Sequence, residues 1–186
     1  MLETNIFDTY TQILKEELIP AMGCTEPIAI AYAASILRDA LGEEPLSIRA
    51  GFSGNIIKNV KSVIVPATDG LKGIPVAIAA GIIANAPKKQ LEVLCSLPKD
   101  APERIDRFLS DHPIEIYKIE KSPPFEINIE ATSASHTARV RFVGSHTSID
   151  EVTLDGKDVS RRYAFSCSVN SDSNGNADRS LLNVKD

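Results

Sequence analysis

Residues 25–41 form an alanine-rich run that is apolar almost all the way round a helix. Pro27 is tolerated only in the first turn of a helix and Gly42 is a plausible C-terminal cap, so we predict one helix from residue 25 to residue 41. A helix without a polar face has to be buried on several sides. The rest of the chain must therefore cover it, and the run of small residues over 74–85 is the obvious helical partner.

The spacing of the apolar residues changes at Ile114. Before it, helices are predicted over 2–19 and 101–110, an alternating strand over 46–50, and a short buried strand over 62–65. After it, apolar and polar residues alternate as they do in half-buried strands, over 114–119, 125–130, 138–143 and 149–154. An Asp-Gly turn at 155–156 suits a tight hairpin. The predicted fold class is α+β, with a helical N-terminal half followed by an antiparallel sheet.

The domain organisation predicted is one α+β region over residues 1–165 and a polar, disordered tail over 166–186. A chain of 186 residues with 43% hydrophobic content can build one core. The net charge of -5 argues against nucleic acid or an anionic membrane as the main partner. No apolar run is long enough to span a bilayer, and the three scattered cysteines suggest no disulfide framework, so we expect a cytoplasmic protein.

Cys24 lies where the predicted buried helix begins. Thr25 is the expected N-cap, and the charge of Glu26 suits the positive end of the helix dipole. Unpaired N–H groups of a first helical turn favour a thiolate, so we predict that the pKa of Cys24 falls below that of a free thiol. The alternative is a buried structural cysteine beside a helix cap, which is the more common role of a lone cysteine.

A second candidate segment spans residues 51–59. Its glycines let the backbone approach a ligand, Asn55 and Asn59 offer amide donors and acceptors, and Lys58 offers a cation for a carboxylate. A small anionic substrate would suit this segment, and the alternative is a polar turn with a solvated lysine. The segment lacks the Gly-Lys-Ser/Thr ending of a phosphate-binding loop, so nucleotide binding is not supported.

A histidine and a threonine, His146 and Thr147, lie between two predicted strands. A loop histidine can transfer protons or orient a substrate carboxylate, because it titrates near neutral pH; the alternative is a hairpin histidine in water. His136 and Thr137 form a similar pair inside a Ser/Thr-rich turn, and we interpret that pair as a decoy. Cys95 is expected in the core because its neighbours are apolar.

Four motifs that occur in order resemble the serine dehydratase-like family that includes L-cysteine desulfidase. They are Gly23–Pro27 with the alanine-rich helix, Ser53–Asn59, Val65–Pro75 and Gly144–Ile149. The resemblance covers roughly residues 8–160. It implies a lyase that uses a four-iron four-sulfur (4Fe-4S) cluster, without pyridoxal phosphate, to split L-cysteine into hydrogen sulfide, ammonia and pyruvate.

The resemblance also implies roles for individual residues. Cys24 matches the family cysteine proposed as the base that removes the α-proton. Asn55, Lys58, His146 and Thr147 fall on matching motif positions, and we expect them to hold a small amino-acid substrate, L-cysteine or L-serine.

The chain departs from that family after residue 160. Members are longer and hold their cluster with cysteines of a C-terminal half, whereas Cys167 alone cannot hold a cluster. We therefore expect the N-terminal portion of such a lyase, without metal ligands and inactive unless a C-terminal partner chain supplies the missing half. Without that half, exposed apolar surface on the helices over 28–34 and 74–84 is expected to cause self-association. The alternatives are a catalytically dead fragment that acts at most as a binding or interaction module, and an L-serine dehydratase-type lyase.

Overall fold

The computed structural model describes residues 2–17 and 23–165. Helix α1 (Leu2–Glu17) belongs to one compact unit and is described by itself, while the described residues from 23 onward lie in another. Helix α1 confirms the helix predicted near the N-terminus, where Ile13 is buried and Phe7 and Leu14 are exposed. The predicted polar tail over 166–186, including Cys167, lies outside the described residues.

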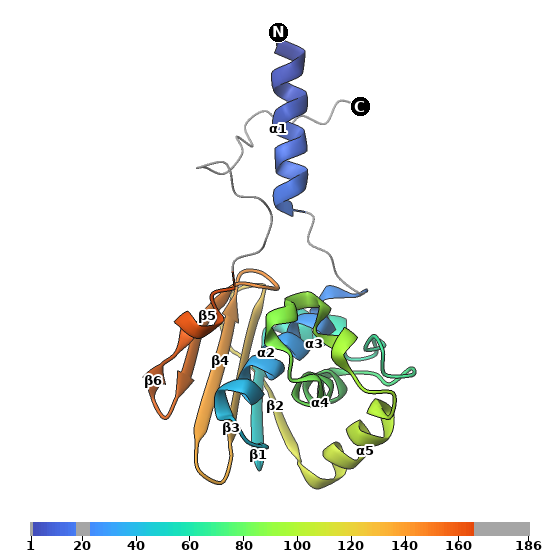
Figure 1. Cartoon of the computed structure of the whole chain (residues 1–186), viewed down its shortest axis with the longest axis vertical. Helices are drawn as coiled ribbons and strands as arrows, with labels where there is room; N and C mark the ends of the chain where they lie inside the picture. Colours follow the sequence, from blue (N-terminus) through green and yellow to red (C-terminus); the bar gives the residue numbers. More distant parts are fainter. Residues whose placement is uncertain (1, 18–22, 166–186) are drawn as a thin grey trace. The chain divides into compact units, whose positions relative to one another are not determined.

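The larger unit confirms the α+β class (Figure 1). Its elements in chain order are α2 (Thr25–Leu41), β1 (Ser47–Phe52), α3 (Gly54–Val60), α4 (Ile74–Ala84), the 3-10 segment η1 (Pro87–Ser96), α5 (Ala101–Asp111), β2 (Ile114–Lys118), β3 (Glu126–Thr132), β4 (Thr137–Val143), β5 (Ile149–Leu154), β6 (Lys157–Asp158) and the 3-10 turn η2 (Ser160–Tyr163).

The strands of this unit form a mixed sheet in the order β2-β1-β3-β4-β5-β6. Strands β1 and β2 run parallel, and the other neighbouring strands run antiparallel. The sheet is therefore mixed rather than wholly antiparallel as predicted, because β1, at the strand predicted over 46–50, joins it and runs parallel to β2. The connection from β1 to β2 contains three helices and η1, which gives the chain enough length to return and run in the same direction.

The short buried strand predicted over 62–65 is not formed. Ile64 makes only an isolated bridge with Lys72, and its side chain is exposed, whereas Val65 is buried. Apolar composition alone suggested the strand, but no neighbouring strand is available to extend the bridge into a ladder.

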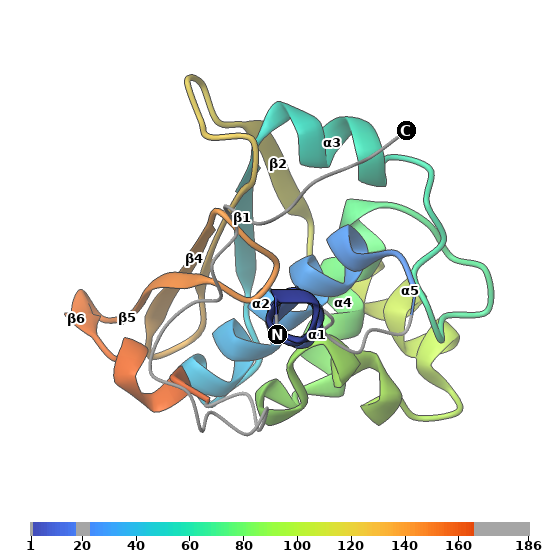
Figure 2. The ribbon, with the colours of Figure 1, turned by 90° about the horizontal axis from the view of Figure 1, so that it is seen from above.

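Helix α2 packs against the sheet on one side and against α4 on another, as Figures 1 and 2 show. Every residue from 27 to 37 is buried, which confirms the prediction from the apolar pattern. Tyr32 meets Phe142 of β4 edge to face, with ring centroids 5.3 Å apart. The predicted pairing with α4 is confirmed, and Gly81 permits it because a Cβ there would overlap the carbonyl oxygen of Ala31. None of the described helices is long and apolar enough to cross a membrane.

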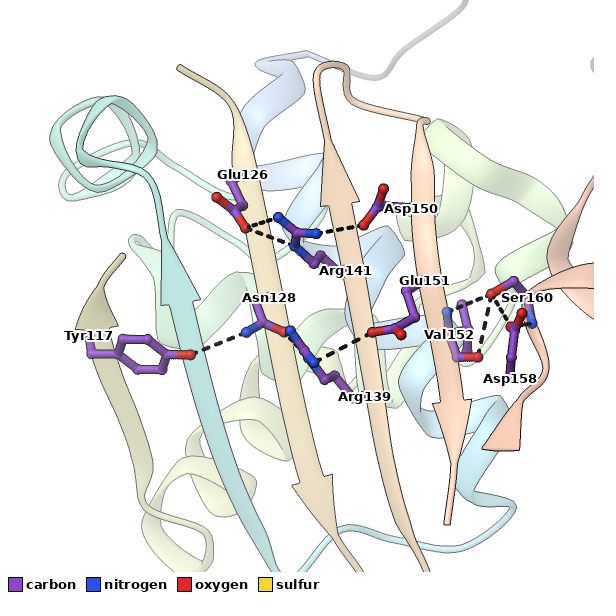
Figure 3. Close-up of polar contacts among 10 residues, drawn as sticks. All are labelled: Tyr117, Glu126, Asn128, Arg139, Arg141, Asp150, Glu151, Val152, Asp158 and Ser160. Atoms are coloured by element: carbon purple, nitrogen blue, oxygen red, sulfur yellow. Dashed lines mark hydrogen bonds and ion pairs between the residues drawn. The ribbon is translucent and has the colours of Figure 1, made fainter. Parts of the chain in front are cut away.

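The other face of the sheet carries a polar network (Figure 3). The carboxylate of Glu126, which is buried, accepts a hydrogen bond from Nε of Arg141 and forms an ion pair with Nη2, at 2.8 Å each, and Asp150 accepts a hydrogen bond from Nη1 at 2.7 Å. Asn128 joins Tyr117 of β2 to Arg139 of β4 through hydrogen bonds of 3.3 and 2.8 Å. The period of two along each strand separates these side chains from the apolar ones that face α2.

Candidate functional site

Helix α2 begins at Thr25 as predicted, but its N-cap differs from the prediction. Cys24, and not Thr25, is the N-cap residue, with extended backbone angles (φ −61°, ψ 121°), and Thr25 is the first helical residue. Pro27 then occupies the third helical position, where the N–H group that proline lacks would have no partner within the helix. This geometry places the thiol at the mouth of the helix, as the sequence predicted, and Cys24 is exposed rather than a buried structural cysteine.

The thiol of Cys24 donates a hydrogen bond to the carboxylate of Glu26. The distance from Sγ to Oε2 is 3.2 Å. The pKa of Cys24 is raised, first by partial burial and then by the hydrogen bond and the negative charge of Glu26; the backbone N–H of Glu26 opposes them and is outweighed. The prediction of a lowered pKa was wrong, because partial burial of the thiol, together with the hydrogen bond to Glu26 and its negative charge, outweighs the effect of the helix N–H.

The pKa of the Glu26 carboxyl group shifts in the opposite direction to that of Cys24. Partial burial acts to raise the pKa of its carboxyl group, but hydrogen bonds from Cys24, from its own backbone N–H and from Asn59 outweigh burial, and the pKa is lowered. The charge of His146 also contributes to this lowering. The pair therefore consists at neutral pH of a protonated thiol beside an ionised carboxylate.

Asn59 connects α3 to this pair. Its Nδ2 donates a hydrogen bond to Oε1 of Glu26 at 3.3 Å. Asn55, Lys58 and Asn59 are all exposed, and their spacing puts them on one side of α3, while Ile56 and Val60 on the other side are buried.

The start of α3 is fixed by the residue that precedes it. Ser53 is buried; its hydroxyl donates to the carbonyl of Pro124 at 2.9 Å, and its N–H donates to the carbonyl of Glu126 at 3.0 Å. These two bonds hold the end of β1, and with it the first residues of α3, against the chain that leads into β3. The exposed side of α3 is thereby held in a defined position next to α2.

His146 lies in the loop between β4 and β5. Its ring packs against Phe125, with centroids 4.7 Å apart, and its Nε2 atom is buried without a hydrogen-bond partner in the described chain. A buried, unpartnered ring nitrogen is available to a substrate or to a neighbouring carboxylate.

The structure brings together Cys24, Glu26 and Asn59, with His146 close enough to influence Glu26 electrostatically. Within the described residues, no hydrogen bond joins Asn55, Lys58 or Thr147 to this group. Asn59 belongs to the candidate segment predicted over 51–59, where it was named as an amide donor and acceptor, but it was not among the residues expected to hold the substrate.

The structure also gives the positions of His136 and Cys95, for which the sequence made predictions. His136 lies in the turn between β3 and β4, where its Nδ1 is 2.7 Å from Asp155 Oδ2. Cys95 is exposed on η1, so its prediction as a core residue was wrong. Where side chains are described, no three His, Cys, Asp or Glu gather in a metal-binding geometry. The 4Fe-4S cluster stays a prediction.

Comparison with known proteins finds relatives in many bacteria. The chain is 42% identical over 178 residues to a UPF0597 protein of Desulfitobacterium hafniense, an alignment that covers 96% of this chain and 40% of that protein. It is 37% identical over 185 residues to a UPF0597 protein of Treponema denticola (100% and 42% covered), and 34% identical over 184 residues to one of Fusobacterium nucleatum (99% and 42% covered). The chain thus spans about two fifths of the length of these curated relatives. No family model and no solved structure matches it.

These relatives correct the family predicted from the four motifs. Each of the relatives above carries the name UPF0597, and they align with nearly the whole of this chain rather than with short motifs. Glycines, prolines and polar residues at helix starts and turns recur wherever the backbone needs the same local geometry, so four short motifs were not enough to identify a family. The similarity of this chain is to the UPF0597 proteins and not to the serine dehydratase-like family.

Proposed function

We propose that Cys24 and Glu26 form the proton-transfer pair of an active site for a small amino acid, with the thiol as proton donor and the carboxylate as base. The observation that carries the proposal is the 3.2 Å hydrogen bond between them together with their opposite pKa shifts. Two adjacent titratable groups whose pKa values are pushed apart are typical of an acid and a base. The proposal reverses the role first predicted for Cys24, because a protonated thiol gives a proton rather than taking one.

The substrate class follows from the groups around the pair. Lys58 lies on the same exposed side of α3 as Asn59, which contacts Glu26, so it is placed to attract a carboxylate. Asn55 on that side offers an amide, and His146 offers a buried ring nitrogen without a partner. These groups suit the carboxylate and the amino group of a small amino acid such as L-serine or L-cysteine.

A lyase reaction fits this pair. Glu26 would accept the α-proton of the amino acid, and Cys24 would give its proton to the departing hydroxyl or thiol. The aminoacrylate left behind takes up water to give pyruvate and ammonia, with water or hydrogen sulfide as the other product. Participation of a 4Fe-4S cluster is a separate proposal. A change in the rate of pyruvate release after addition of iron and sulfide would test it.

Substrate protection of Cys24 tests the site directly. The chain is treated with iodoacetamide with and without L-serine, and alkylation is measured by peptide mapping at Cys24 and at Cys95, the other exposed cysteine among the described residues. We expect L-serine to slow the alkylation of Cys24 and to leave Cys95 unchanged. Lys58→Gln should remove the protection, whereas Lys61→Gln, an exposed lysine three residues away, should keep it. Equal alkylation of Cys24 with and without L-serine would refute the binding site.

A measurement of turnover tests the proposed lyase reaction. Pyruvate release from L-serine and from L-cysteine is measured for the chain alone and after anaerobic addition of iron and sulfide. Because a positioned acid or base contributes about 100-fold or more, Glu26→Gln and Cys24→Ala should each lower the rate by at least that factor. A rate that either variant leaves unchanged would show that the pair does not transfer the proton.

A further inference from the structure

A cleft lies at the C-terminal end of α2, beyond the candidate site. It has a volume of about 700 Å³ and is lined by the last turns of α2 and α4 and by one side of α5. Clefts of this size, in the range of roughly 300–1,000 Å³, are typical of sites for small molecules. Its apolar part comes from Phe108, which is almost fully buried, and from Ile82 and Ile83 at the end of α4.

The side of α5 that faces the cleft is charged. Asp100, Arg104, Arg107 and Asp111 recur at helical spacing and all line the cleft. Arg104 and Asp100 are satisfied by each other, since Nε lies 2.8 Å from Oδ2. The other charged residues of α5 in the cleft, Glu103, Arg107 and Asp111, form no ion pair with any residue that the structure describes, although the charge of Arg107 also acts on Asp100.

Unpaired charges of both signs meet in this cleft. Arg38, on the last turn of α2, and Arg107 form no ion pair with any residue that the structure describes. The same holds for Glu44 and Asp111 among the described residues. A ligand with a single charge would meet repulsion from one set of these side chains, whereas a zwitterion can satisfy both.

We infer that the cleft binds a free α-amino acid with an apolar side chain. The guanidinium groups of Arg38 and Arg107 receive its carboxylate, and the carboxylates of Glu44 and Asp111 receive its ammonium group. The side chain of the ligand then lies over Phe108 and the end of α4, where it leaves water. Each of the three parts of the ligand has a matching part of the cleft.

This site is separate from the pair of Cys24 and Glu26. Glu26 lies in the first turn of α2 and Arg38 in its last turn, and the 12 positions between them correspond to about 18 Å along the helix axis. The helix between them is buried. Binding at the cleft therefore neither requires nor excludes the proton-transfer function, and the failure of one leaves the other standing.

The contribution of each part of the ligand to binding can be measured with analogues, without any change to the protein. L-leucine is titrated into the ¹⁵N-labelled full chain, and amide shifts are followed by NMR. We expect saturable shifts at α5 and at residues 82–85. Three analogues should each bind at least about ten-fold more weakly: L-leucinamide lacks the carboxylate, 4-methylpentanoate lacks the ammonium group and glycine lacks the apolar side chain. The absence of saturable shifts would overturn the inference, as would equally tight binding of 4-methylpentanoate.

Variants assign the binding to this cleft. Arg107→Gln, at an exposed position, should weaken L-leucine binding about ten-fold, and Arg38→Gln should do the same. Arg161→Gln is the matched control, since Arg161 is an exposed arginine on η2 outside the cleft, and it should bind like the unchanged chain. Circular dichroism checks that each variant is folded. Unchanged affinity in Arg107→Gln would overturn the assignment, and the analogue series decides the ligand class even if Arg38→Gln does not fold.

Discussion

Gly81 of α4 lies so close to Ala31 of α2 that a Cβ at position 81 would overlap the carbonyl oxygen and the carbonyl carbon of that residue. The atoms it would meet belong to the backbone of a helix that is buried on all sides, so they cannot rotate away. This contact sets the distance between the two helices that form the centre of the helical layer.

Gly81→Ala is expected to destabilise the protein. Alanine favours a helix over glycine by about 1 kcal/mol, but overpacking against a fixed backbone costs more, so we expect a net loss of about 1–3 kcal/mol in the free energy of unfolding. Urea unfolding followed by circular dichroism measures the loss. Gly54→Ala is the control, because its Cβ would lie 3.5 Å from the flexible end of Lys118, an ordinary contact. Equal stability of the two variants would contradict the close approach.

Glu26→Gln is expected to lower the pKa of Cys24. The carboxylate raises that pKa through its hydrogen bond and its negative charge, and glutamine keeps an acceptor but loses the charge. More of the thiol is then ionised at a given pH, so iodoacetamide should alkylate Cys24 faster at pH 7.5. The rate at Cys95, mapped in the same samples, is the internal reference. A rate at Cys24 equal to that of the unchanged chain would show that the charge of Glu26 does not act on the thiol.

In Asp155→Asn, the stability of the fold should fall less as the pH is lowered than it does in the unchanged chain. The pKa of Asp155 is lowered, first by the backbone N–H of Thr137 and then by His136, so its contribution is present above the unfolded pKa of about 4 and is lost as the pH falls further. Asparagine accepts the same hydrogen bond and tolerates the left-handed backbone at this position (φ 50°), but does not titrate. Thermal unfolding between pH 3 and pH 7 should show the difference between the two proteins shrink below about pH 4. Parallel curves would contradict this.

Replacement of Arg141 should lower the free energy of unfolding more than replacement of Arg49. Arg141→Met leaves the Glu126 side chain, which is 7% exposed, without its hydrogen bond and its ion pair, and we expect a loss of about 1–3 kcal/mol in the free energy of unfolding. Arg49 and Glu115 form an exposed pair (59% and 63%), so Arg49→Met should cost about 1 kcal/mol or less. Chemical denaturation of both variants gives the comparison. A larger loss for Arg49→Met would mean that burial of Glu126 does not determine the cost.

Local signals in the sequence predicted the elements well. Pro27 and Gly42 mark the two ends of α2, and the all-apolar pattern between them predicted its burial correctly. The place of β1 was not predictable in the same way, because its neighbours β2 and β3 are chosen by contacts between residues far apart in the chain. An alternating pattern in one strand says which side faces the core and does not say which strand lies beside it.

In the candidate site, too, the local sequence predicted the position of a residue but not the contacts it makes with distant residues. The sequence located Cys24 at the start of a helix, but it gave the wrong direction for the pKa, because it shows neither the partial burial of the thiol nor the hydrogen bond that the thiol donates to Glu26. The contact of Asn59 with Glu26 joins residues 33 positions apart and depends on how α3 lies against α2. The electrostatic influence of His146 depends in turn on the position of the β4–β5 loop, which no motif specifies.

The position of β1 between β2 and β3 has a consequence for synthesis of the chain on the ribosome. Both neighbours of β1 are translated long after it, since Ile48 pairs with Ile114 on one side and with Ala131 on the other. Until those residues emerge, β1 has no strand to pair with and the apolar surface of α2 has no sheet to cover it. The nascent chain therefore passes through a period in which a strand edge and an apolar helix are open to other molecules, and a chaperone that shields them should raise the yield of folded protein.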